Sequence, residues 1–197
     1  MTNTKFNKSF WETRYVNHQT GWDIGYISTP LKIYFDQIKN KEISILIPGA
    51  GNAYEAEYLF NNGFSNVYIM DIAAQPLINL KNRIPDIKDK FLLQDDFFSH
   101  EGRYDLIIEQ TFFCSLDPEL RSNYATKINE LLKSKGKLIG VLFDTSFKQE
   151  GPPFGGNSSE YLKIFSQHFN IRTLGTCYNS ILPRREQEVF INFEKKK

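Results

Sequence analysis

The 197-residue sequence lacks several features that would assign it to a class at once. It has only two cysteines, Cys114 and Cys177, and neither forms a CxxC pair or a cluster with histidine. This argues against a zinc or iron–sulfur site and favours buried free thiols in a reducing compartment. It has no GxxxxGK[ST] phosphate loop and no apolar run near the ~20 residues of a membrane span. The polar start, Met1–Ser9, lacks the apolar core of a signal peptide, so we expect a cytoplasmic protein without a bound metal.

Neither sign of charge is in excess, because 24 Lys and Arg face 23 Asp and Glu and leave a net charge of +1. Nucleic-acid binders usually carry a clear basic excess, and disordered chains have a lower hydrophobic content than the 41% found here. We therefore expect one domain over residues 1–197, a monomer whose partner is a small molecule rather than a nucleic acid or a membrane. Aromatic residues, by contrast, are unusually frequent and make up 15% of the sequence.

Short apolar runs alternate with segments of helical periodicity along most of the chain. Strands are predicted over residues 43–47, 67–70, 91–93, 104–108, 137–143, 171–178 and 188–193, and helices over 53–61, 76–84, 118–132 and 158–168. The link between the last two strands is too short for a crossover helix, so these two strands should be antiparallel. The pattern predicts an α/β fold with a mostly parallel sheet and a C-terminal hairpin, whose ligand lies at the carboxyl ends of the strands.

A glycine turn follows the first predicted strand. Gly49 and Gly51 allow the backbone to approach a ligand closely, and Asp71, at the end of the next strand, can accept hydrogen bonds from both hydroxyls of a ribose. Tyr54 stands where the dinucleotide fingerprint has its third glycine, which disfavours a pyrophosphate. A cofactor with ribose but no phosphate, such as S-adenosylmethionine, suits the turn better. A tight turn followed by a helix-capping aspartate is the structural alternative.

Asp96 and Phe97 follow the third predicted strand. The carboxylate can accept a hydrogen bond from an adenine amine, and the ring can pack on the base. A solvated turn aspartate beside a core phenylalanine explains the same two residues, and the sequence leaves both interpretations open.

Several motifs in sequence order resemble the thiopurine methyltransferase superfamily of class I S-adenosylmethionine-dependent methyltransferases, in its thiol/halide methyltransferase branch. The resemblance runs from about Phe10 to Arg185. It rests on Trp11-Glu12, Gly21-Trp22-Asp23-Ile24-Gly25, Thr29-Pro30, Ile47-Pro48-Gly49-Ala50-Gly51, Phe112-Phe113-Cys114, Pro118-Glu119-Leu120-Arg121, Tyr124-Ala125, Gly151-Pro152-Pro153-Phe154, and Pro183 with Arg185.

The resemblance implies a Rossmann-like core over residues 41–197, with helices on both faces of a seven-stranded sheet, and an N-terminal helical lid over residues 1–40. It implies S-adenosylmethionine as the cofactor. The implied cofactor contacts are Trp11, Tyr15, Trp22, Gly49, Asp71, Asp96, Phe97 and Gln110, and the glycine turn adds Gly51. Tyr15 and Gln110 depart from the family pattern, because the family has tryptophan and tyrosine there. Gln110 keeps hydrogen bonding but loses a ring.

The implied reaction is in-line methyl transfer to a thiol, hydrosulfide, thiocyanate or halide. Aromatic faces suit a cationic sulfonium, and a dry pocket removes the hydration shell of an anionic nucleophile. We expect a substrate wall of Phe112, Phe113 and Phe154, although core packing explains the first two equally well. Arg185, or its neighbour Arg184, is expected to hold an anionic substrate. Asp23, Glu109 and Tyr178 are candidate bases, and the sequence does not separate them.

Three other functions remain open at this point. A thiopurine-type S-methyltransferase is related, but that branch has an arginine near Gln110 that is absent here. A nicotinamide oxidoreductase would use a similar sheet, although Tyr54 weighs against it. A cofactor-binding protein without turnover is compatible with the change at Gln110.

Overall fold

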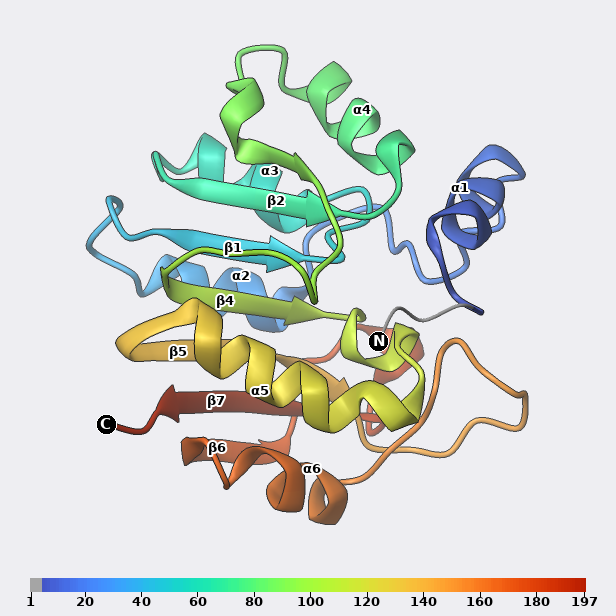
Figure 1. Cartoon of the computed structure of the whole chain (residues 1–197), viewed down its shortest axis with the longest axis vertical. Coiled ribbons are helices and arrows are strands. Elements are labelled where there is room, and N and C mark those ends of the chain that lie inside the picture. The colour runs from blue at the N-terminus through green and yellow to red at the C-terminus, as the bar shows by residue number, and fades with distance from the viewer. Residues whose placement is uncertain (1–4) are drawn as a thin grey trace.

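The computed structural model describes residues 5–197 (Figure 1). Residues 1–4, part of the polar start compared above with a signal peptide, lie outside the described residues. Seven strands form one sheet in the order β3-β2-β1-β4-β5-β7-β6. The strands are β1 (Ile45–Pro48), β2 (Val67–Asp71), β3 (Leu92–Gln94), β4 (Tyr104–Gln110), β5 (Leu132–Phe143), β6 (Phe169–Thr176) and β7 (Glu188–Lys195).

The strand directions follow the predicted pattern. The pairs β1/β2, β2/β3, β1/β4 and β4/β5 are parallel, whereas β7 is antiparallel to both β5 and β6. The predicted fold class is confirmed: a mostly parallel seven-stranded sheet that ends in an antiparallel hairpin.

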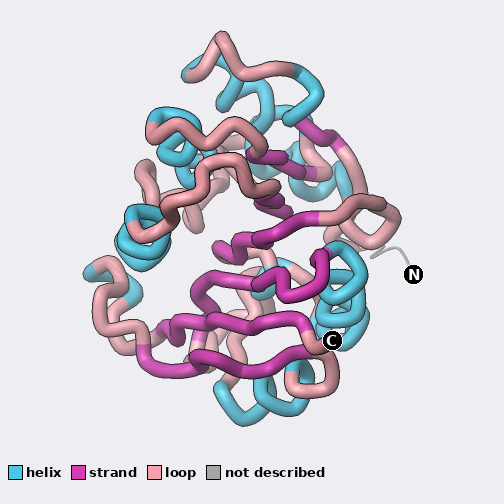
Figure 2. Tube along the Cα trace, turned by 90° about the vertical axis from the view of Figure 1, so that its left-hand side faces the viewer, coloured by secondary structure: helices cyan, strands magenta, loops and turns pink. Residues whose placement is uncertain are grey.

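Helices cover both faces of the sheet, as the cartoon and the Cα trace turned by 90° show (Figures 1 and 2). The helices are α1 (Lys8–Val16), α2 (Thr29–Asp36), α3 (Tyr54–Asn61), α4 (Ala74–Arg83), α5 (Arg121–Leu131) and α6 (Ser158–Phe165). Strand residues alternate between two core layers, so that Leu46 packs with α5 and α6 while Ile45 and Ile47 pack with α2, α3 and α4. Both layers bury apolar side chains, which is why the central strands read as continuous apolar runs.

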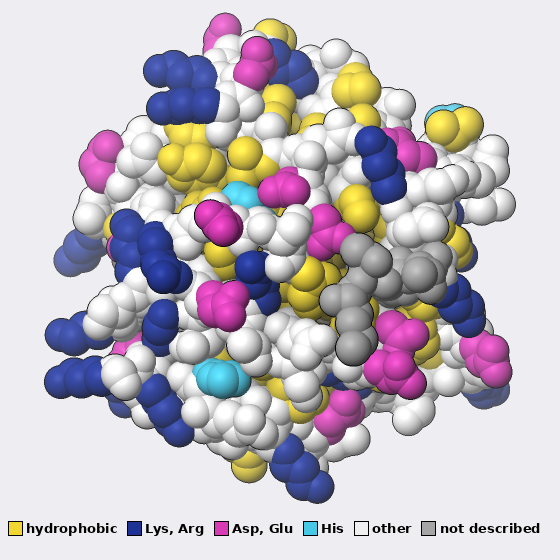
Figure 3. All heavy atoms as spheres, viewed as in Figure 1, with side chains coloured by type: hydrophobic (Ala, Val, Ile, Leu, Met, Phe, Trp, Pro, Cys, Tyr) yellow, Lys and Arg dark blue, Asp and Glu magenta, His cyan; other side chains and the backbone are white. Residues whose placement is uncertain are grey.

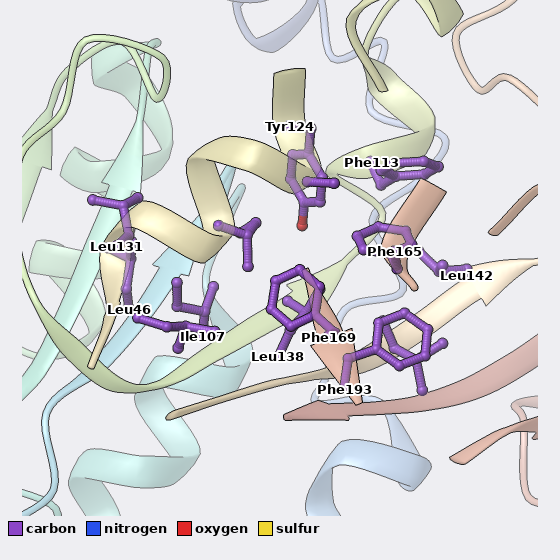
Figure 4. Packing of buried hydrophobic residues seen from close by; sticks show 14 of the residues in the cluster. Leu46, Ile107, Phe113, Tyr124, Leu131, Leu138, Leu142, Phe165, Phe169 and Phe193 are labelled. Carbon is purple, nitrogen blue, oxygen red and sulfur yellow. The ribbon is translucent and has the colours of Figure 1, made fainter. Parts of the chain in front are cut away.

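Aromatic side chains fill much of the layer under α5 and α6 (Figure 4). Tyr124, Phe165, Phe169 and Phe193 are each at most 1% exposed. The ring centroids of Phe165 and Phe193 lie 5.0 Å apart. Part of the aromatic surplus is therefore core, and only the remainder is free to form a site.

The N-terminal segment divides differently from the predicted lid over residues 1–40. Leu31 and Phe35 of α2 are fully buried in the layer with α3 and α4. Helix α2 is thus part of the core, because its i, i+4 pair of large apolar residues needs a partner surface. Only α1 and the loop that follows it lie beyond the strand ends, at the right of Figure 1.

Two element boundaries also differ from expectation. The predicted helix over 118–132 opens as a 3₁₀ turn, η3 (Pro118–Leu120), in which the Asp117 carboxylate accepts a hydrogen bond from the Glu119 amide, before α5 begins. Strand β5 begins at Leu132, five residues before the predicted start. Its register against β4 shifts there, and Lys135 has a left-handed φ of 62°. A positive φ at a lysine gives no signal in the sequence.

Both signs of charge occur on the face shown in Figure 3, and Lys and Arg side chains gather along its left edge, away from α1. Within residues 5–197, no helix combines the length and the apolar character that crossing a membrane requires.

Candidate functional site

A cavity of about 680 Å³ lies at the carboxyl ends of the parallel strands, and residues of α1 contribute to its lining. This volume is within the usual range for a small-molecule site. Its lining comes from the lid segment (residues 6–26), the turn after β1 (49–55), the ends of β2 and β3 (70–72, 95–98), the turn after β4 (110–116), the loop after β5 (143–153) and Arg184. The cavity is therefore at the edge of the sheet where the sequence predicts the ligand.

The glycine turn after β1 is built from left-handed backbone. Gly49 and Gly51 have φ values of 55° and 53°, and Ala53 adopts the same region at 56°. A Cβ atom at Gly49 would lie 2.1 Å from Cδ2 of Phe112, so the turn and this ring are in direct contact. Gly49 thus allows both the left-handed backbone conformation and the close approach of the turn after β4.

Asp71 ends β2 and is fixed to the glycine turn. Its Oδ2 accepts a hydrogen bond from the Gly51 amide at 3.0 Å, and its Oδ1 accepts one from the Ala73 amide at 2.9 Å. Burial raises the pKa of the Asp71 carboxyl to about 6, although the hydrogen bonds from these two amides lower it. The carboxylate is pre-oriented, and its remaining lone pairs can accept ligand hydroxyls.

Three aromatic residues from α1 and its loop form a cover over the turn. The ring of Trp22 contacts those of Trp11 and Tyr15 edge to face, with centroids 5.5 and 5.8 Å apart. Burial raises the pKa of the Tyr15 phenol, so this group stays neutral. Helix α1 is held in place because Glu12 Oε1 accepts a hydrogen bond from the Ala74 amide at 2.6 Å, at the start of α4.

The loop after α1 is held from both sides. Asp23 accepts hydrogen bonds from the Gly25 amide at 2.7 Å and from the Asn52 side chain. Arg184, buried to 9% exposure, donates to the Trp22 carbonyl at 2.8 Å. Asp23, a candidate base, thus lines the cavity but is tied to the loop and the glycine turn.

The end of β3 contributes the predicted pair. Asp96 lines the cavity, and its Oδ1 accepts a hydrogen bond from the Phe98 amide at 2.7 Å. Phe97 also lines the cavity, although it is only 5% exposed and stacks on Tyr124 at 5.3 Å. Phe97 is thus a core residue with one edge at the site.

Glu109 lies under the turn after β4, outside the cavity lining. It is 0% exposed and accepts hydrogen bonds from the amides of Phe112 (2.8 Å) and Phe113 (2.9 Å) and from the Tyr124 hydroxyl (2.6 Å). Burial raises the pKa of its carboxyl to about 7. This corrects its candidacy as a base, because its oxygens shape the turn and do not face the ligand space.

The neighbouring Gln110 does line the cavity. Its buried Oε1 has no hydrogen-bond partner among the described protein atoms. Buried polar atoms normally have partners, so this oxygen is an acceptor ready for a ligand N–H.

Four further predicted residues do not reach the cavity, which corrects their predicted roles. Phe113 is 1% exposed and packs in the core against Tyr124, with centroids 5.1 Å apart. Phe154 lines a neighbouring, second cavity instead. Tyr178 is 84% exposed in the turn after β6, and Arg185 is exposed. In the late loop the buried arginine is Arg184, which the sequence offers only as an alternative to Arg185.

Glu109 should make stability depend on pH. Its folded-state pKa of about 7 lies above the ordinary 4.5, so between these values the folded chain retains a proton that the unfolded chain releases. This contribution to stability is fully present below about pH 4.5 and is lost as the pH rises to about 7. We expect Glu109→Gln to remove roughly 3 kcal/mol of the change in the free energy of unfolding with pH across this range. Urea unfolding of the wild type and the variant at about pH 5 and about pH 7.5 measures how much the free energy of unfolding changes between these pH values. An equal change in both proteins would contradict the prediction.

The cavity fits S-adenosylmethionine by three observations. The glycine turn faces the lid closely, and a Cβ at Gly51 would fill the space between them, since it would lie 3.3 Å from the Tyr15 hydroxyl and 3.9 Å from Nε1 of Trp22. Asp71 is fixed at the end of β2, where a ribose binds in such sheets. The unpartnered Gln110 oxygen and the indole faces suit an ammonium group and a sulfonium.

Comparison with known sequences agrees with this fit. The sequence model of the thiopurine S-methyltransferase family matches residues 6–196. A probable thiol methyltransferase 2 of Arabidopsis thaliana is 29% identical over 159 residues, which cover 78% of this chain and 70% of the relative. Thiocyanate methyltransferase 1 of Brassica oleracea is 26% identical, with 77% and 69% covered. A thiopurine S-methyltransferase of Psychrobacter cryohalolentis is 23% identical, with 85% and 88% covered.

Solved structures share the fold at low identity. The 1,6-didemethyltoxoflavin-N1-methyltransferase of Burkholderia thailandensis, with bound substrate and S-adenosylhomocysteine, superposes with a TM-score of 0.74 at 14% identity, covering 96% of this chain and 87% of that one. The magnesium protoporphyrin IX methyltransferase of Synechocystis with bound S-adenosylhomocysteine gives 0.71 at 13% identity, covering 96% and 97%. The chain belongs to the thiopurine S-methyltransferase family of S-adenosylmethionine-dependent methyltransferases.

Proposed function

We propose that the protein transfers a methyl group from S-adenosylmethionine to a small soft nucleophile: a thiol, hydrosulfide, thiocyanate or a halide. The observation that carries this proposal is the make-up of the cavity beyond β4. Among the described residues from 111 onward that line it, Arg184 is the one charged side chain. The others are Thr111, Phe112, Cys114, Ser115, Leu116, Phe143, Phe147, Gln149, Pro152 and Pro153.

This part of the cavity suits an acceptor that is already a nucleophile. It contains no carboxylate among its described lining residues. Glu109 lies behind the turn after β4, where both of its carboxylate oxygens already accept hydrogen bonds from the protein. Hydrosulfide, thiocyanate, thiolates and iodide need no base, and an apolar wall removes their hydration shell. The guanidinium of Arg184 forms an ion pair with Glu188 at 3.5 Å, and as the one cation among the described residues that line this part of the cavity it would also attract an anionic acceptor.

The other half of the cavity would hold the cofactor. When bound, S-adenosylmethionine supplies an electrophilic methyl group on a positively charged sulfur. Asp71 would accept hydrogen bonds from the ribose hydroxyls, and Asp96 would accept one from the adenine amine. Trp11, Tyr15 and Trp22 would cover the opening and exclude water. Phe112 packs on Gly49 and lines the cavity, so its ring would limit where the acceptor can approach. Holding two reactants in line can lower the barrier by about 7–11 kcal/mol, so little acid–base chemistry is needed.

A panel assay tests the proposal. We expect methylated product from hydrosulfide, thiocyanate, iodide or a small thiol, at higher kcat/KM than from a thiopurine. The related thiol and thiocyanate methyltransferases support this order. A preference for the thiopurine would replace the proposal with the thiopurine-type activity. Calorimetric binding of S-adenosylmethionine without any product would indicate a protein that binds the cofactor without turnover.

A further inference from the structure

A second cavity, of about 620 Å³, adjoins the first. It lies between the loop after β5 and the residues before α1, and the loop is the long orange segment below α1 in Figure 1. Three residues line both cavities: Phe6, Phe147 and Gln149. These three side chains therefore stand between the two spaces.

The second cavity reaches the protein surface. Five residues of its lining are exposed: Lys5, Ser146, Gln149, Glu150 and Asn157. The first cavity also has exposed lining residues, among them Gln19 and Tyr26, but these belong to the lid segment, which Glu12 and Arg184 hold in place. The second cavity would thus offer an acceptor a path from solvent that avoids the lid.

Aromatic rings form the junction between the cavities. The ring of Phe147 contacts Phe143 edge to face at 5.0 Å, and that of Phe6 contacts Phe154 at 5.6 Å. Phe6 is only 7% exposed and adjoins α1, whereas Phe147 is half-buried in the loop. Phe147 is therefore the side chain whose size can be changed with the smallest effect on the lid.

We propose that the methyl acceptor enters through the second cavity and that Phe147 sets the largest acceptor that can pass. This inference rests on the proposed function, because it assigns a route to the same acceptor. Asp117, Asp144 and Glu150 line the second cavity together with Lys5, so acidic groups outnumber the one basic group among the described lining residues and disfavour multiply charged anions, since like charges repel. The ring and the acids select together for small acceptors of low charge.

Acceptor selectivity is the first test. We expect Phe147→Ala to raise kcat/KM for thiophenol relative to hydrosulfide by about tenfold, and Phe147→Trp to lower this ratio. The calorimetric affinity for S-adenosylmethionine should stay within about twofold, since a difference below 0.5 kcal/mol is expected for a site that the cofactor does not touch. Lys148→Ala, an exposed neighbour that lines neither cavity, is the matched control.

Alkylation of Cys114 tests the route without turnover. This thiol lines the first cavity, so its accessibility reports passage through the junction. In a Cys177→Ser background with S-adenosylhomocysteine bound, the rate of each reagent is divided by its rate with a free small thiol, and this relative rate should be higher for iodoacetamide than for N-phenylmaleimide. Phe147→Ala should raise the N-phenylmaleimide rate by about tenfold, whereas Lys148→Ala should not change it.

The outcomes separate the two proposals. If no acceptor is methylated, the proposed function fails, and the alkylation rates still decide the route. If acceptors are methylated but Phe147→Ala changes neither the selectivity ratio nor the N-phenylmaleimide rate, the route is overturned. A parallel loss of cofactor affinity in Phe147→Ala would likewise overturn it, because Phe147 would then belong to the cofactor half.

Discussion

Replacing Asp71 with alanine is expected to weaken S-adenosylmethionine binding by about tenfold or more. The carboxylate is buried at 7% exposure and oriented by two amides, so a ribose would meet a pre-formed acceptor. Losing a hydrogen bond to a charged group costs roughly 1.5–3 kcal/mol. Isothermal titration calorimetry measures the change, and unfolding in urea checks that the variant still folds.

Asp71→Asn provides the matched variant. It keeps the volume of the side chain but places an N–H₂ donor beside one of the two backbone amides, so we expect affinity to fall here too. The pKa of about 6 adds a second signature: wild-type affinity should decrease as the pH falls below this value and the carboxylate takes up a proton. In Asp71→Asn this decrease should vanish. Unchanged affinity in both variants would remove Asp71 from the site.

Gly49→Ala is expected to be the most destabilising single-methyl change in the turn after β1. The residue has a left-handed φ of 55°, and the added Cβ would lie 2.1 Å from Phe112. The backbone conformation alone costs about 1–2 kcal/mol for an L-residue, and overpacking adds about 1–3 kcal/mol. Urea unfolding should show the sum.

Two further variants identify the cause. Gly175→Ala adds the same methyl group where nothing lies within 4 Å and should change stability little. Phe112→Ala removes the ring that the new Cβ would strike, so Gly49→Ala should cost less in that background, by roughly 0.5–3 kcal/mol. Strictly additive effects would show that Phe112 is not the obstacle.

The parts of the site that could be predicted lie at strand ends. Asp71 and Asp96 follow buried apolar runs, and parallel strands bring their carboxyl ends to one edge of the sheet. Glu109 could also have been interpreted correctly from alternation along β4. It shares the face of Ile107, which packs under α5, so its side chain points into the core rather than to the strand end.

Neighbouring residues in turns could not be told apart from the sequence. Phe112 lines the cavity and Phe113 packs in the core, while Arg184 is buried and Arg185 is exposed. Turns have no fixed side-chain period, so neither pair carries a signal of direction. Arg184, moreover, acts through Trp22, a contact across 162 positions that no local pattern reveals.

That long-range contact has a consequence for biosynthesis. Arg184, in the turn between β6 and β7, is synthesised 162 residues after Trp22. Domains made N-terminal end first begin to fold during synthesis, but the Trp22 carbonyl has no Arg184 to meet until the turn between β6 and β7 has been made. A nascent chain that stalls before this turn would form much of the sheet, but the loop that carries Trp22 would lack its hydrogen bond from Arg184.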